Sequence, residues 1–127
     1  MHALIVDDSK AMRSVLRNML REAGFEVSEA GNGREALERL RQNQQIQVAL
    51  VDWNMPEMDG FDFVCAMRAD PDYARLCVLM VTIETDLGRV SEALSAGANE
   101  YLMKPFTKEA LYGKLDLLGI SSSKAES

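Results

Sequence analysis

The sequence predicts one α/β domain, built as a five-stranded parallel sheet with helices on both faces. Short apolar runs that suit buried strands alternate with amphipathic segments of helical spacing along the chain. The connections between them are short, and this alternation is typical of parallel strands joined by right-handed helical crossovers. A length of 127 residues is enough for one such domain with a two- or three-layer core.

The first half of the chain contains two predicted strands and two predicted helices, over residues 3–6, 10–23, 25–30 and 34–43. Ser9 can cap the first helix and Gly24 can end it. Apolar residues recur at helical spacing in that helix, at Met12, Val15, Leu16, Met19 and Ala23. The expected inward residues of the second helix are Ala36, Leu37 and Leu40.

The third predicted strand, residues 47–51, is the clearest strand signal. It is an apolar, largely β-branched run that stops at Asp52. Pro56 disfavours helix at the residue before it, and Asp59-Gly60 is a turn or helix-entry signal. Asp52 is therefore expected at the carboxyl end of a central strand, which is where open α/β sheets bind ligands.

The second half is predicted to continue as helix, strand, helix, strand and helix, over residues 61–69, 76–81, 86–96, 101–103 and 108–118. Thr107 can cap the last helix, and Gly113 inside it costs about 1 kcal/mol relative to alanine. We expect the folded domain to cover residues 1–119 and residues 120–127 to form a polar, disordered tail.

Composition argues against a surface that binds nucleic acid or an anionic membrane. With 14 Lys and Arg against 20 Asp and Glu the formal charge is −6, so we expect no direct binding of nucleic acid and no membrane insertion. No apolar run approaches the roughly 18 residues of a membrane helix, and a secretory leader is not indicated. Cys65 and Cys77 lie in apolar runs, which predicts two buried free thiols in a cytoplasmic protein.

Four of the five predicted strands end at polar residues. These are Asp7-Asp8, Asp52, Thr82 and Lys104. Each has an ordinary explanation alone, since an aspartate can cap a helix and a lysine can be a solvated surface charge. Parallel strands end at one edge of the sheet, however, so all four groups are expected to lie together.

This set of residues points to phosphoryl chemistry. Neighbouring carboxylates repel unless a cation intervenes, and Mg²⁺ suits one or two carboxylates plus water. A carboxylate can then act as a nucleophile toward phosphorus and form an aspartyl phosphate. Lys104 and Thr82 can stabilise the negative charge of the phosphoryl group.

At this point the chain resembles the receiver domains of two-component response regulators, and most closely their single-domain chemotaxis members. The matching segments are Ile5-Val6-Asp7-Asp8-Ser9, residues 51–60 (Val-Asp-Trp-Asn-Met-Pro-Glu-Met-Asp-Gly), Leu79-Met80-Val81-Thr82 and Lys104-Pro105-Phe106-Thr107. They occur in the expected order over nearly the whole chain. The resemblance implies a flavodoxin-like (βα)5 fold with strand order 2-1-3-4-5.

The resemblance also implies a role for each matching residue. Asp52 would accept a phosphoryl group from a histidine kinase or a histidine phosphotransfer protein. Mg²⁺ would be held by Asp7, Asp8, Asp52 and the backbone carbonyl of Asn54. Thr82 and Lys104 would contact the phosphoryl group.

Further implied features concern the switch. Tyr101 would turn inward when Thr82 moves toward the phosphoryl group, and the Lys104–Pro105 peptide bond would be cis. A protein partner would then bind the surface formed by residues 86–96, 101–103 and 107–118. Such a protein assists its own phosphorylation and dephosphorylation but is not a turnover enzyme, and we expect a monomer or weak dimer.

Two positions depart from the family pattern. Ile83 follows Thr82 where a small residue is usual, and we hypothesise that it narrows the path to Asp52 and slows phosphoryl transfer or hydrolysis. Asp86 and Leu87 stand where the chemotaxis members carry partner-binding lysines, which makes a flagellar motor partner doubtful. Asn54 and Glu84 resemble the chemotaxis members and suggest a short-lived phosphoryl group.

Three alternatives belong to other classes. An aspartate-nucleophile phosphatase also uses Mg²⁺ at a sheet edge, but Asn54 stands where its second aspartate is expected, and the chain has no room for a cap. A flavin-binding module shares the topology, although the acidic loop from Asp7 to Lys10 does not suit a flavin phosphate. A receiver that is never phosphorylated could act as a scaffold.

Overall fold

The computed structural model describes residues 1–83 and 87–120. In this part of the chain five parallel strands form one sheet in the order β2-β1-β3-β4-β5, which confirms the predicted topology. The strands are β1 (His2–Val6), β2 (Glu26–Ala30), β3 (Ile46–Val51), β4 (Cys77–Thr82) and β5 (Glu100–Met103). The helices are α1 (Lys10–Glu22), α2 (Gly33–Gln42), α3 (Gly60–Arg68), α4 (Leu87–Ala96) and α5 (Lys108–Leu117), and a 3-10 turn, η1, covers Pro71–Tyr73.

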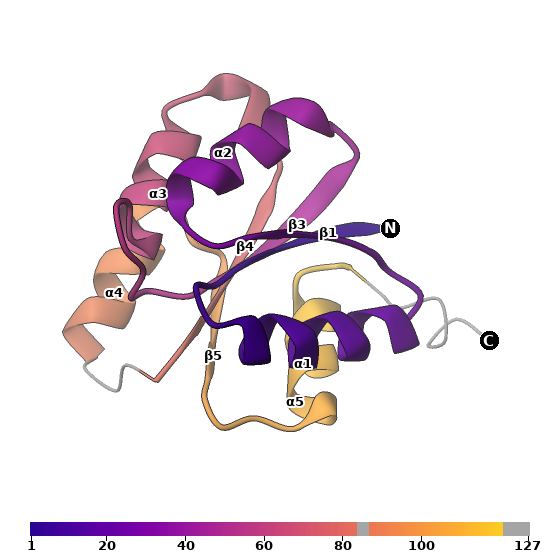
Figure 1. The fold of residues 1–127 in the computed structure, drawn as a ribbon. Coiled ribbons are helices and arrows are strands. Elements are labelled where there is room, and N and C mark those ends of the chain that lie inside the picture. Colours follow the sequence, from indigo (N-terminus) through magenta and orange to yellow (C-terminus); the bar gives the residue numbers. More distant parts are fainter. Residues whose placement is uncertain (84–86, 121–127) are drawn as a thin grey trace.

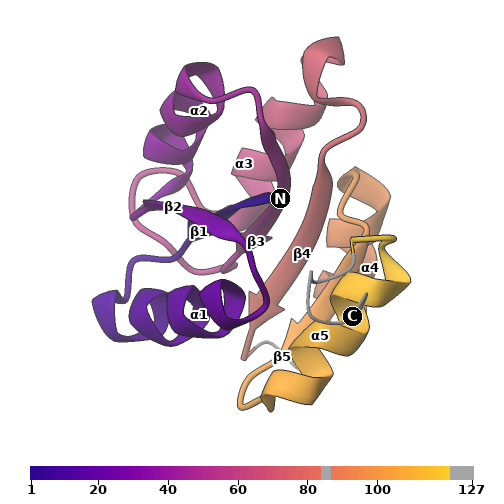
Figure 2. The ribbon, with the colours of Figure 1, turned by 90° about the vertical axis from the view of Figure 1, so that its right-hand side faces the viewer.

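Helices cover both faces of the sheet (Figure 1). Helices α2, α3 and α4 pack on one face through Ala36, Leu40, Phe63, Val64, Met67 and Ala93. Helices α1 and α5 pack on the other face through Leu16, Leu20, Leu111 and Leu115. Figure 2 shows β2 and β5 at opposite edges of the sheet, so β1, β3 and β4 are the central strands.

The central strands are buried on both faces. In β1, Leu4 and Val6 belong to the core beneath α2, α3 and α4, whereas Ala3 and Ile5 belong to the core beneath α1 and α5. Strands β3 and β4 alternate between the two cores in the same way. A strand buried on both sides has no polar face, and this is why these segments appear in the sequence as unbroken apolar runs.

Side-chain caps fix where four helices begin. The side chains of Ser9 and Thr107 accept hydrogen bonds from the third residue of α1 and α5, as predicted. Asn32 and Asp59 cap α2 and α3 in the same way. Each cap satisfies one unpaired backbone N–H and stabilises its helix by about 1 kcal/mol.

The prediction of two buried thiols is wrong for Cys65, which is exposed, and Cys77 is half-buried; both are free. In α3 the buried side chains are Phe63, Val64 and Met67. A helix turns by about 100° for each residue, so Cys65, two positions after Phe63, faces away from the core. Its place within an apolar run therefore did not indicate burial.

The packed domain also reaches one residue further than predicted. Ile120, expected in the tail, is 6% exposed and belongs to the core beneath α1 and α5. Its backbone N–H donates to the carbonyl oxygen of Leu115 after Gly119 turns the chain with a φ of 77°. Residues 121–127 lie outside the described part of the chain. In residues 1–83 and 87–120, no helix has the length and apolar character needed to cross a membrane.

Candidate functional site

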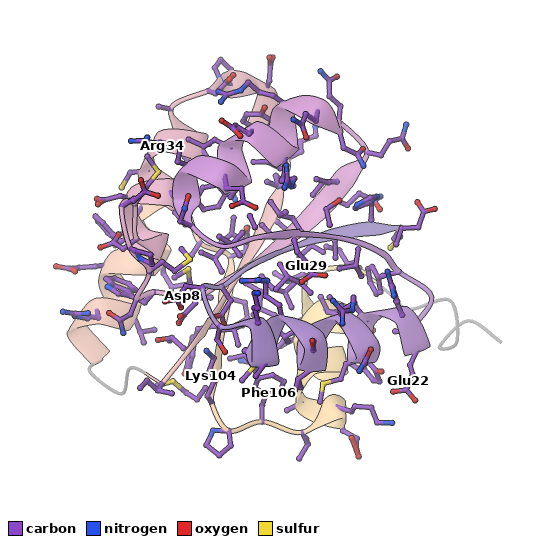
Figure 3. The ribbon with its side chains drawn as sticks, in the orientation of Figure 1. Asp8, Glu22, Glu29, Arg34, Lys104 and Phe106 are labelled. Carbon is purple, nitrogen blue, oxygen red and sulfur yellow. The ribbon has the colours of Figure 1, made fainter. Side chains whose placement is uncertain are left out.

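The polar residues that end four strands lie at one edge of the sheet, as expected. The backbone N–H of Asp52 donates to the carbonyl oxygen of Val6 at 2.9 Å, so the ends of β3 and β1 are held side by side. The N–H of Lys104 donates to the carbonyl oxygen of Thr82, also at 2.9 Å, and joins the ends of β5 and β4. Figure 3 labels Asp8 and Lys104 at this edge.

Three carboxylates form the centre of the site. Asp7, Asp8 and Asp52 each offer an oxygen atom, and these atoms lie within 4.8 Å of one another. Asp7 is buried at 2% exposure, Asp52 is half-buried and Asp8 is exposed. The site is thus open to solvent on the side of Asp8 and closed beneath Asp7.

Lys104 supplies the positive charge of the site. Its ammonium nitrogen lies 3.2 Å from Oδ2 of Asp7 and 3.7 Å from Oδ1 of Asp52. The lysine side chain is 14% exposed, so these pairs are screened less by water than a surface ion pair. One ammonium among three carboxylates still leaves the cluster negatively charged.

The surroundings of Asp52 raise its proton affinity. Its pKa is raised from 3.8 to about 6, mainly by burial; the charges of Asp7 and Asp8 also raise the pKa, whereas Lys104 lowers it. Burial disfavours the charged form of a carboxylate, and so do like charges nearby. The donor set of three carboxylates open to solvent fits Mg²⁺, which takes hard oxygen ligands and keeps several waters.

The loop from β3 to α3 brings the backbone of Gly60 close to that of Asp52. A Cβ at Gly60 would collide with the carbonyl oxygen of Asp52, so glycine is required for this approach. The Gly60 N–H donates to the carbonyl oxygen of Trp53 at 2.9 Å. Glu57, with a φ of 64°, accepts a hydrogen bond from the side chain of Asn32. The loop is therefore anchored both to the end of β3 and to the start of α2.

The two expected switch residues share a pocket. Thr82, 2% exposed, and Tyr101, half-buried, both line a small pocket beneath α4 together with Trp53. The ammonium of Lys114 lies 4.8 Å from the centre of the Tyr101 ring, and it also pairs with Glu100 at 3.2 Å. A contact of this kind between a cation and a ring is attractive, so it holds the present orientation of Tyr101.

Of the other positions singled out in the sequence, some belong to the described residues and some do not. Asn54 and Ile83 are both exposed, Ile83 at 66%. The Lys104–Pro105 peptide bond has the cis form that the resemblance implies. Glu84 and Asp86 lie outside the described residues, as does the side chain of Leu87.

One contact of the site was missed from the sequence. Arg13 lies in the first half of α1, and its guanidinium donates to the backbone carbonyl of Asp7 at 2.6 Å. The signal available was the position of Arg13 one turn into the helix that follows Asp7-Asp8. Helical spacing shows which way a side chain leaves its own helix but not which strand end it meets.

Comparison with known proteins now gives the family. The sequence model described as "Response regulator receiver domain" matches residues 3–116. The chain belongs to this family. This receiver domain is 44% identical over 119 residues to a protein named "Chemotaxis protein CheY1" from Helicobacter pylori. The aligned region covers 93% of this chain and 96% of that relative. It is 43% identical over 126 residues to "Chemotaxis protein CheY homolog" from Campylobacter jejuni, covering 98% and 97%.

Solved structures agree with the fold. The chemotaxis response regulator CheY4 of Vibrio cholerae superposes with a TM-score of 0.86 at 38% identity, over 92% of this chain and 97% of that one. A response regulator/GGDEF domain protein superposes with a TM-score of 0.87 at 33% identity, over 93% of this chain but 48% of that chain. The chain is therefore the receiver domain of a CheY-type response regulator in two-component signalling.

Proposed function

We propose that this receiver domain accepts a phosphoryl group on Asp52 from a histidine kinase or a histidine phosphotransfer protein. The observation that carries the proposal is the gathering of Asp7, Asp8 and Asp52 within 4.8 Å with Lys104 against two of them. Asp7, Asp8, Asp52 and the Asn54 carbonyl would hold Mg²⁺. When bound, this ion supplies positive charge that offsets the carboxylates and the incoming phosphoryl oxygens.

Asp52 is suited to the role of nucleophile. Its pKa of about 6 leaves the carboxylate largely ionised at neutral pH. One carboxylate oxygen forms a bond to phosphorus while the bond from phosphorus to the donor's histidine nitrogen breaks, which gives an aspartyl phosphate and a free imidazole. Lys104, already 3.7 Å from Oδ1 of Asp52, is within reach of the new phosphoryl oxygens.

The output is proposed to be a change in protein binding. Thr82 and Tyr101 line one pocket beneath α4, so a shift of the Thr82 hydroxyl toward a phosphoryl group would open space for the tyrosine ring. This favours a second arrangement of the surface of α4, β5 and α5 and changes its affinity for a downstream partner. We propose a cytoplasmic monomer or weak dimer that acts as a switch, in chemotaxis or a related pathway, rather than as a turnover enzyme.

The test uses Trp53, the single tryptophan of the chain, which follows Asp52 directly and is 7% exposed. Its fluorescence is recorded during addition of Mg²⁺ and then of acetyl phosphate or beryllofluoride, with Asp52→Asn as the control. We expect a response to Mg²⁺ and a further change that requires Asp52. Failure of both responses at millimolar ligand would support a scaffold role, and multiple turnover of a phosphomonoester would instead support a phosphatase.

A further inference from the structure

Arg13 makes a contact that the proposed chemistry does not use. The side chain is 17% exposed, and its guanidinium donates through Nη1 to the carbonyl oxygen of Asp7 at 2.6 Å. Through Nε it donates to Oε1 of Glu29 at 3.2 Å. A planar guanidinium can hold two acceptors at fixed angles, so this arginine connects α1 both to the end of β1 and to β2.

Glu29 holds the arginine in this orientation. Glu29 belongs to β2, the strand next to β1, and it pairs with Ile5 in the sheet register. It lies over α1 (Figure 3). Its second oxygen accepts from Nη1 of Arg17 at 2.8 Å. Arg17 thus shares the carboxylate with Arg13, while the hydrogen bond to Asp7 comes from Arg13. The two arginines form a natural pair of test and control.

The direction of the Asp7 carbonyl affects the position of Asp8, which is one of the proposed metal ligands. It belongs to the planar peptide unit that also contains the backbone nitrogen of Asp8, so the direction of this oxygen sets the direction in which Asp8 leaves the strand. The other groups of Asp7 are held as well. Its N–H donates to the Ala30 carbonyl at 3.0 Å, and its Oδ1 accepts from the Ser9 N–H at 2.9 Å.

Asp8 differs from Asp7 and Asp52 because it is exposed. Asp7 and Asp52 are held by burial and by Lys104, whereas packing contributes little to the orientation of an exposed side chain. The orientation of the peptide plane between Asp7 and Asp8 is therefore the main constraint on the direction in which the Asp8 side chain leaves the backbone. A wrong tilt of that plane would move one of three ligands away from the other two.

We propose that Arg13 is a positioning residue for the metal site: by fixing the Asp7 carbonyl it orients Asp8 for Mg²⁺. This inference rests on the proposed function, because it assumes that Asp7, Asp8 and Asp52 bind the ion. Groups that orient metal ligands without touching the metal typically change its affinity by about 10- to 100-fold when removed. Arg13 is expected to act at the lower end of this range because its contact is with backbone.

The experiment measures Mg²⁺ affinity through Trp53 fluorescence in the wild type, Arg13→Gln, Arg13→Lys and Arg17→Gln. We expect the dissociation constant to rise about 10-fold in Arg13→Gln. Arg17→Gln removes one ion pair with Glu29 but leaves the bond to Asp7, so its affinity should stay within about twofold of wild type. Arg13→Lys retains a donor for the carbonyl and should recover part of the loss.

A second readout separates positioning from general damage. At saturating Mg²⁺ the rate of Asp52 phosphorylation by acetyl phosphate should return to the wild-type value in Arg13→Gln, while the Mg²⁺ concentration for half the maximal rate rises. Equal affinity in wild type and Arg13→Gln would overturn the inference, as would an equal loss in Arg17→Gln. If Arg13→Gln does not fold, Glu29→Leu removes the acceptor that orients Arg13, and an unchanged affinity in that variant would overturn the inference. A wild type that does not respond to Mg²⁺ would instead contradict the proposed function.

Discussion

Asp52 is the residue whose chemistry depends most on its surroundings. Well below pH 3.8 it is neutral in both the folded and the unfolded chain. Well above pH 6 it is charged in both, and the folded state then bears the cost of burying a charged carboxylate beside Asp7 and Asp8. A raised pKa in the folded state therefore lowers stability as the pH rises from about 4 to about 6.

Asp52→Asn is expected to stabilise the metal-free protein at pH 7.5. Asparagine removes the charge. The difference between pKa values of 3.8 and about 6 sets an upper limit of about 3 kcal/mol on the gain in the free energy of unfolding, at about 1.4 kcal/mol for each pKa unit. The gain should shrink between pH 6 and pH 4. Urea unfolding with a chelator at both pH values measures it, and a gain that does not depend on pH would contradict the assignment to Asp52.

Ile83 affects the reaction rate if its side chain narrows the approach to the site. At 66% exposure it makes little contribution to the core, so Ile83→Ala should change stability by less than about 0.5 kcal/mol. We expect faster phosphorylation by acetyl phosphate and faster loss of the phosphoryl group. Rates equal to those of the wild type would exclude this role for Ile83.

At the scale of elements, two glycines show how differently the same residue can be used. Gly60 begins α3 so close to β3 that a methyl group would meet the Asp52 backbone, which cannot move without moving the site. Gly113 lies inside α5, and a Cβ there has no neighbour within 4 Å. The first glycine is required by packing, whereas the second lowers helix stability.

Gly60→Ala should therefore destabilise the protein by at least about 1–3 kcal/mol through overpacking and should weaken the Trp53 response to Mg²⁺. Gly113→Ala is the matched control and should stabilise by about 0.5–1 kcal/mol. Thermal unfolding of both variants gives the comparison. Opposite signs support the difference in packing, and equal effects would contradict it.

The elements also show what a sequence can and cannot predict. Strand and helix order, the sheet topology implied by the resemblance and the strand-end residues were recognisable because each depends on local pattern or on motifs. The exposure of Cys65 and the contact of Arg13 with Asp7 depend on which face of a helix meets which neighbour. That information is distributed over segments far apart in the chain. Ile120 packs into the core although the residues that follow it in the sequence are polar.

At the scale of the whole molecule, Arg68 connects several segments. From the end of α3 its guanidinium donates to the carbonyl oxygens of Tyr73 and Leu76, which lead into β4, and to that of Gly97, between α4 and β5. Burial lowers the pKa of Arg68, yet its five donors are well matched to carbonyl oxygens. This arginine therefore joins α3 to the segments that enter the last two strands.

Arg68→Met should cost about 2–4 kcal/mol, because several carbonyl oxygens lose a donor that contributes about 1 kcal/mol each. Arg34→Met is a suitable control, since Arg34 is exposed and points away from the sheet (Figure 3). It should change stability by less than about 0.5 kcal/mol. Denaturant unfolding of both variants tests this, and a small effect of Arg68→Met would show that water replaces the arginine.

The pairing of Lys104 with Asp7 and Asp52 has a consequence for the whole switch. Under the proposed function, Lys104 competes with Mg²⁺ for the oxygen atoms of these two carboxylates. Because the ammonium is part of the same chain, its local concentration does not change with conditions in solution. The affinity for Mg²⁺ would therefore be lower than that of the three carboxylates alone, and the domain would respond only at correspondingly higher Mg²⁺ concentrations.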